Sequence, residues 1–180
     1  MPVFSEPQDY RLFLKYVREC LVRSDCQLHA YVLMTNHFHM MVTPAIDSGV
    51  SRFMQILGAK YVRYYNERHE RSGTLWQGRY KAGLVNSDAY IMSCMRYIEL
   101  NPVRANMVKH PRDYRWSSYR ANAGEVADEL ITPHSMYGEL SPDPFDRGRQ
   151  YARWVATQTD DPAVDVIRAA TRQSRGVRVE

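Results

Sequence analysis

Two apolar runs at residues 28–34 and 37–42 constrain the fold more than any other part of the chain. In both runs apolar residues alternate with polar or bulky ones. This alternation is typical of a β-strand, where successive side chains point to opposite faces of a sheet. Thr35 and Asn36 between the runs are polar and few enough to close a hairpin. We therefore expect two antiparallel strands joined by a short connection.

Two histidines stand at the head of the second strand, next to the turn. His37 and His39 are separated only by Phe38, so both imidazole rings project from the same face of the sheet. Neutral imidazole is the commonest metal ligand in proteins, but it is also a common solvated or hydrogen-bonded side chain on a sheet surface. The pair alone leaves a metal site and a structural role both open.

A helix is predicted directly before the hairpin. Apolar residues recur at helical spacing over residues 6–23. Ser5 is the expected cap, with Pro7 in the first turn and Gln8 in the capping-box position.

Further helices and a strand are predicted after the hairpin. We expect a second helix over residues 50–69, a further strand over residues 81–86, and a third helix that begins at residue 87 and is ended by Asn101-Pro102. This order is that of a ferredoxin-like βαββαβ unit without its first strand. The predicted fold is therefore α+β, with an antiparallel sheet, helices on one face and a C-terminal helical extension.

The predicted domain organisation has three parts. Residues 1–120 form the catalytic and DNA-binding unit, residues 121–172 form an extension of loops and short helices, and residues 173–180 form a disordered tail. Within the extension we expect helices near residues 132–137, 144–157 and 162–172.

The composition is that of a globular protein, with 44% hydrophobic and 24% charged residues. We find neither a signal peptide nor an apolar stretch of membrane-spanning length, and expect a cytoplasmic protein without membrane contact. Cys20, Cys26 and Cys94 are odd in number and lack a Cys-x-x-Cys pair. This pattern argues against a disulfide framework and against a structural zinc site.

Positive charge is concentrated in the middle of the chain. Residues 51–120 contain 13 Lys or Arg and 5 Asp or Glu, a net charge of +8, whereas the remaining residues carry −4. Many aromatic residues lie between these cations, which suits a surface that binds phosphates and unstacked bases. Amphipathic helices with aromatic cores and solvated cations would give the same composition, so both interpretations stand.

The third predicted helix carries one further candidate. Tyr90, Cys94, Tyr97 and Asn101 fall on one stripe, beside an apolar stripe that is the natural core face. Tyr97 is therefore expected at the edge of the buried side. A half-buried tyrosine with a hydrogen-bonded hydroxyl is the ordinary structural interpretation of such a position.

Three stretches in order resemble a known family. They are residues 31–39, which contain His37-Phe38-His39, residues 73–81 and residues 96–105. Together they resemble the HUH single-strand transposases, specifically the REP-associated tyrosine transposase group of the IS200-like superfamily, over roughly residues 6–120. The resemblance implies a ferredoxin-like fold and a DNA nickase and strand transferase that acts on hairpin-forming repeats.

The resemblance also assigns roles to residues. It implies Tyr97 as the nucleophile that forms a 5′-phosphotyrosine intermediate, and His37 and His39 as metal ligands. Asn101 matches the polar residue that completes the metal site in related transposases. Two imidazoles, an amide oxygen and open positions favour Mg²⁺ or Mn²⁺.

The expected partner is single-stranded or hairpin DNA, bound by a monomer or a homodimer. From composition and position we expect the DNA contacts to come from Arg63, Trp76, Arg79, Tyr80, Lys81, Arg96 and Arg104. Family members usually begin with a strand before the first helix, so either the natural start lies upstream or this is a decayed copy. A DNA-binding remnant without catalysis and a metal-dependent hydrolase of small substrates are the alternatives.

Overall fold

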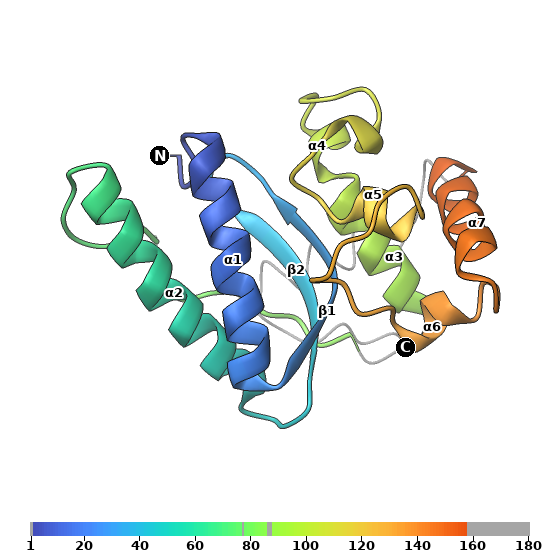
Figure 1. Ribbon diagram of the computed structural model, residues 1–180, viewed down its shortest axis with the longest axis horizontal. Helices are drawn as coiled ribbons and strands as arrows, with labels where there is room; N and C mark the ends of the chain where they lie inside the picture. Colours follow the sequence, from blue (N-terminus) through green and yellow to red (C-terminus); the bar gives the residue numbers. More distant parts are fainter. Residues whose placement is uncertain (1, 77, 86–87, 158–180) are drawn as a thin grey trace.

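A computed structural model describes residues 2–76, 78–85 and 88–157 (Figure 1). A helix, a β-hairpin and a second long helix come first, followed by the helix that carries Tyr97 and by short helices that lead to a last long one. The elements are α1 (Pro7–Ser24), β1 (Cys26–Leu33), β2 (Phe38–Pro44), α2 (Gly49–Arg68), α3 (Asp88–Glu99), α4 (Asn101–Arg104), the 3₁₀ turn η1 (Pro111–Asp113), α5 (Tyr119–Asn122), α6 (Ser135–Gly138) and α7 (Pro144–Thr157).

The predicted hairpin is confirmed. Strands β1 and β2 are antiparallel, and Val32 lies opposite His39 in their register. The register shifts at His29, which is an extra residue in β1 and forms a β-bulge. His37 lies in the connection rather than in the strand, and its carbonyl accepts a hydrogen bond from the backbone N–H of Met34 (2.8 Å).

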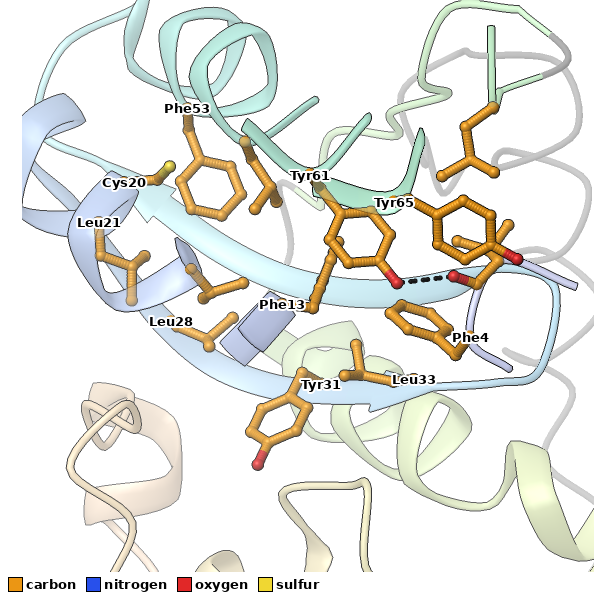
Figure 2. Packing of buried hydrophobic residues seen from close by; sticks show 14 of the residues in the cluster. Phe4, Phe13, Cys20, Leu21, Leu28, Tyr31, Leu33, Phe53, Tyr61 and Tyr65 are labelled. Atoms are coloured by element: carbon orange, nitrogen blue, oxygen red, sulfur yellow. Dashed lines mark hydrogen bonds between the residues drawn. The ribbon is translucent and has the colours of Figure 1, made fainter. Parts of the chain in front are cut away.

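Helices cover both faces of β1. Helices α1 and α2 lie on one face, where Leu28 and Leu33 pack against Phe13 and Tyr61 (Figure 2). Helix α3 lies on the other face and packs against Ala30, Val32 and Met34. The α+β class with its antiparallel sheet and C-terminal helix is confirmed, but the helices do not keep to one face. Since seven of the eight residues of β1 are buried, both of its faces need an apolar cover.

The long helices agree with the sequence prediction, and α7 has the predicted bounds. Helix α3 ends at Glu99, ahead of Pro102 as expected, but the chain then forms one further turn, α4. Pro102 is tolerated there because the first turn of a helix has no intrahelical partner for a backbone N–H. The helix expected near residues 132–137 is α6. The predicted helix at 162–172 and the tail at 173–180 lie outside the described residues.

The strand predicted at residues 81–86 is wrong for its described part, where Val85 alone makes a bridge. Over the described residues the sheet has two strands. The outer edge of β1 is instead covered by later segments of the chain. The backbone N–H of Leu33 donates to the carbonyl of Trp116 (2.9 Å), and that of Ser118 donates to the carbonyl of Tyr31 (3.0 Å). These bonds occupy backbone groups that an open edge would leave to solvent.

The segment before α1 is fixed to the hairpin and to α2. The backbone N–H groups of Val3 and Phe4 donate to the carbonyl of Thr35 (2.8 and 3.0 Å). The hydroxyl of Tyr61 donates to the carbonyl of Val3 at 2.6 Å, the bond drawn as a dashed line in Figure 2. The prediction that Ser5 caps α1 is wrong, because the cap is Glu6.

Asp9, rather than the predicted Gln8, completes the capping box. Its buried carboxylate accepts hydrogen bonds from the backbone N–H groups of Ser5 (2.7 Å) and Glu6 (3.1 Å). It also accepts from the side chains of Tyr64 on α2 and of His69, the residue that caps the end of α2. Burial raises the pKa of Asp9, but these four donors outweigh it and hold the pKa below its usual value. One carboxylate thus links the N-terminal segment, α1 and α2.

The three cysteines are buried and free. Each described helix is too short or too polar to span a bilayer. The division of the chain at residue 120 stays a prediction, although residues on both sides of it, such as Ile98 and Tyr151, share one hydrophobic cluster.

Replacement of Asp9 by Asn tests this N-terminal link. We expect Asp9→Asn to lower the free energy of unfolding by about 1.5–3 kcal/mol at neutral pH, because buried donors lose a charged acceptor. Since the pKa of folded Asp9 lies below the usual 3.8, the advantage of the wild type is complete above that value. It should disappear as the pH falls through the folded pKa.

Urea denaturation at a series of pH values measures the effect. The control is Asp47→Asn in the exposed loop between β2 and α2, which should change the stability little. A difference between wild type and Asp9→Asn that does not depend on pH would contradict the charged capping box.

Candidate active site and nucleic-acid surface

The two predicted metal ligands lie side by side at the hairpin. The ring centroids of His37 and His39 are 5.1 Å apart, with the rings nearly perpendicular at 83°. Nδ1 of His37 lies 2.7 Å from the side-chain oxygen of Asn36. An amide oxygen can only accept, so this contact places the proton on Nδ1 and leaves the lone pair of Nε2 for a ligand.

Both imidazoles are held neutral. Burial lowers the pKa of His37. Burial also lowers the pKa of His39, to about 4, and the neighbouring His37 adds to the effect. At neutral pH the pair therefore carries unprotonated ring nitrogens, which is the form that binds a metal ion.

Tyr97 on α3 lies against this pair. Its ring centroid is 5.9 Å from that of His39, at an angle of 70°. Because α3 packs on the sheet face to which the histidines belong, residues 58 positions apart in the sequence meet at one point. Tyr97 is 9% exposed and belongs to the hydrophobic cluster between α3 and the sheet.

Asn101 lies one turn after Tyr97 and is fixed to it. Its side-chain nitrogen donates to the carbonyl of Tyr97 (2.8 Å) and to that of Ile98 (3.3 Å). The carbonyl of Ile98 would ordinarily accept from residue 102, but Pro102 has no N–H, and the amide of Asn101 takes its place. Since the nitrogen is used in this way, the oxygen is the atom of Asn101 that remains to bind a cation.

The three predicted ligands are of the chemical types that bind a divalent cation. Two neutral imidazoles and one amide oxygen can hold Mg²⁺ or Mn²⁺ and leave positions open for substrate oxygens. Nowhere in the described part of the chain do three His, Cys, Asp or Glu side chains gather as a metal site. A metal bound by His37 and His39 therefore needs the oxygen of Asn101, solvent or substrate as its other ligands.

Arg104 also contacts Tyr97. Its guanidinium carbon is 5.0 Å from the centre of the Tyr97 ring, and Nη1 donates to the Tyr97 carbonyl (3.2 Å). A cation over the face of a phenol ring stabilises negative charge on the oxygen, and it can also meet a phosphate. The DNA contact predicted for Arg104 stays a prediction.

Four of the other predicted DNA contacts are exposed, and three of these belong to the connection between α2 and α3. They are Arg63, Arg79, Tyr80 and Lys81. Tyr80 is 42% exposed, and its hydroxyl lies 2.9 Å from that of Ser51 on α2. Arg63 pairs with Glu67 (3.0 Å) on the same helix. Exposed cations and an aromatic ring are the side chains that a nucleic-acid surface needs, and these four contacts stay predictions.

Arg96 and Trp76 have other surroundings. Arg96 is 1% exposed, with its guanidinium over the ring of Trp154 on α7 (4.6 Å), so it cannot reach a DNA backbone and we withdraw it from the predicted contacts. Trp76 is partly buried, with its ring edge-on to Phe38 (5.7 Å) and near Tyr61 (6.2 Å). This packing assigns Trp76 to the core around α1 and α2.

Comparison with known proteins identifies the family. The family model described as "Transposase IS200 like" matches residues 2–101, which is more than half of the chain. The protein therefore belongs to the IS200-like transposases, a family of DNA-processing enzymes that act in transposition and recombination. No curated protein and no solved structure matches the chain.

The contrast between Trp76 and Tyr80 can be tested through stability. Trp76→Ala should lower the free energy of unfolding by about 1–3 kcal/mol, since it removes a partly buried ring from an aromatic cluster. Tyr80→Ala should change it by less than about 1 kcal/mol, because the ring is largely in solvent. Urea denaturation of both variants measures the difference. If Trp76→Ala is as stable as the wild type, Trp76 is not a core residue and is again a candidate for base stacking.

Proposed function

We propose that the protein is a metal-dependent endonuclease and strand transferase that acts on single-stranded DNA, at hairpin-forming repeats, with Tyr97 as its nucleophile. One observation carries the proposal, namely the ring of Tyr97 next to His39 in the His37–His39 pair. Membership of the IS200-like transposases supports DNA as the substrate.

His37, His39 and Asn101 are the residues that would hold Mg²⁺ or Mn²⁺. Bound there, the cation would polarise the scissile phosphate and reduce the repulsion between its oxygens and an incoming nucleophile. The chain supports this role with two imidazoles that are neutral at pH 7 and with an amide whose nitrogen is already hydrogen-bonded.

Tyr97 supplies the chemical step. Its hydroxyl oxygen attacks the phosphorus, the bond from phosphorus to the 3′ oxygen breaks, and the phenol proton passes to solvent while the departing 3′ oxygen gains one. The product is a 5′-phosphotyrosine and a free 3′-hydroxyl. Because one phosphoester replaces another, a later 3′-hydroxyl can reverse the step and join two strands without ATP. The guanidinium of Arg104 beside the ring would stabilise the phenolate during attack.

The DNA path of this proposal runs over the exposed side chains Arg63, Arg79, Tyr80 and Lys81 towards Arg104. The cations would contact phosphates and position the strand, and Tyr80 would stack on an unpaired base. Contacts to phosphates carry no sequence information, so these residues do not determine which DNA sequence is cut. The target sequence would be recognised through base contacts and the shape of the hairpin.

A second candidate is a DNA-binding protein without catalysis. It is favoured by the sheet, which over the described residues has two strands where a ferredoxin-like unit has four. Both candidates bind DNA, and the formation of a covalent bond to DNA separates them.

Tyr97→Phe is the direct test of the nucleophile. The change keeps the ring and its packing and removes only the hydroxyl, so the free energy of unfolding should fall by at most about 1 kcal/mol. Nicking of a labelled single-stranded hairpin with Mn²⁺, and the denaturant-resistant adduct, should both vanish. The matched control is Tyr90→Phe, seven residues earlier on the same helix, which should cut normally.

Two other outcomes of this experiment would change the assignment of the nucleophile. An adduct with Tyr97→Phe but none with Tyr90→Phe would assign the nucleophile to Tyr90. Normal cutting by both variants would exclude tyrosine chemistry. Water activated by a metal at His37 and His39 would then be the better account.

The metal ligands are tested by His37→Ala and His39→Ala. Each should abolish Mn²⁺-dependent cleavage and leave the DNA affinity within a few fold, since affinity comes from phosphate contacts elsewhere. His134→Ala is the control, because His134 forms the other histidine pair of the described residues, with His29 at 4.9 Å. Cleavage that persists in the His37→Ala/His39→Ala double variant would remove the metal hypothesis.

A further inference from the structure

Helix α7 touches the residues on both sides of the Tyr97 position. Arg96 stacks its guanidinium on Trp154 of α7 (4.6 Å), and Glu99 accepts a hydrogen bond from the hydroxyl of Tyr151 of α7 (2.7 Å). The family match ends at residue 101, so α7 lies outside it. A segment beyond the family match thus reaches the helix that carries the proposed nucleophile.

Glu99 is the centre of a buried polar cluster. One carboxyl oxygen accepts from the hydroxyl of Ser118 (2.5 Å) and from the amide of Asn122 (2.7 Å), and the other accepts from Tyr151. The residue has no exposed surface, and burial raises its pKa to about 7 although all three donors lower it. Because a buried carboxyl oxygen without a donor is costly, loss of the Tyr151 bond should disturb the end of α3.

The position of α7 is itself tightly defined. Where α7 crosses the turn that follows α5, a Cβ on Gly148 would lie 2.7 Å from both the Cα and the nitrogen of Gly124. The two backbones touch there, and only glycine fits. Helix α7 therefore cannot slide along this contact without losing it.

The helical geometry of α3 explains why these contacts matter for Tyr97. Successive residues are about 100° apart around a helix, so Glu99 lies about 200° from Tyr97, close to the opposite side. Tyr97 faces His39, while Glu99 and Arg96 face α7 and its neighbours. Contacts on the back of α3 thus fix its rotation, and this rotation determines where the phenol ring points.

We propose that α7 is a positioning element of the active site. Through Tyr151 on Glu99 and Trp154 on Arg96, it holds α3 in the rotation that presents Tyr97 to the histidine pair. This inference rests on the proposed function. Glu99, Arg96, Tyr151 and Trp154 are positioning residues, since they act through α3 and do not contact the DNA themselves.

The test is Tyr151→Phe, which removes only the hydroxyl that donates to Glu99. The single-turnover rate of hairpin cleavage should fall by about tenfold or more, because a small misplacement of a reacting group is costly, while the DNA dissociation constant stays at the wild-type value. The matched control is Tyr137→Phe, because Tyr137 lies in the same hydrophobic cluster as Tyr151. The Tyr137 hydroxyl donates to the carbonyl of Asn122 on α5 (2.8 Å) rather than to α3, so this variant should cleave at the wild-type rate.

Trp154→Leu provides a second variant, since it removes the ring under Arg96 and keeps every hydrogen-bond donor of Glu99. It should show the same split between a lower rate and an unchanged affinity. Wild-type rates in Tyr151→Phe and Trp154→Leu would overturn the proposal. An equal loss of rate in Tyr137→Phe would overturn it too, because the effect would then be a general loosening of the core.

Failure of this inference can be told apart from failure of the proposed function. If Tyr97→Phe abolishes the adduct and the α7 variants cleave normally, only the role of α7 is wrong. If wild-type protein forms no adduct, the proposed function itself is wrong.

Discussion

The burial of β1 on both faces is the constraint on which the rest of the structure depends. A strand that is apolar on both sides must be covered twice, and here α1 and α2 cover one face while α3 covers the other. This second cover brings Tyr97 to His39, because Val32, which packs under α3, lies opposite His39 in the hairpin. The candidate active site is thus a consequence of how the core is closed.

The sequence predicted the elements whose pattern is local. Helices α1, α2 and α7 and the hairpin follow from periodicity, and the pairing of Tyr97 with His37 and His39 followed from family resemblance. The surroundings of Arg96 and Glu99 could not be predicted in this way. Residues 93–99 are all buried, since β1 and the C-terminal helices enclose α3 from several sides, and charged residues there depend on partners distant in sequence. The run of uncharged residues 91–95 in the middle of α3 was the available signal.

The other wrong predictions also concern positions where tertiary contacts decide the structure. Asp9 takes the capping-box position predicted for Gln8, because its carboxylate also reaches Tyr64 on α2 and His69 at the end of α2. Such tertiary contacts are not part of local helix propensity. The segment at residues 81–85 has strand-like residues but makes one bridge only at Val85. The edge of β1 is covered by residues near Trp116 and Ser118, where the sequence analysis predicted no element.

The central claim is that the oxygen of Tyr97 becomes covalently bound to DNA, and the most direct measurement is to map the bond. Hairpin DNA would be cleaved with Mn²⁺, the adduct digested with trypsin and nuclease, and the nucleotide-bearing peptide sequenced by mass spectrometry. Cleavage after Arg96 and Arg104 releases the peptide from Tyr97 to Arg104. We predict that this peptide carries a 5′-nucleotide on Tyr97. A nucleotide on any other residue, or the absence of a covalent adduct from folded protein that binds the hairpin, would contradict the account.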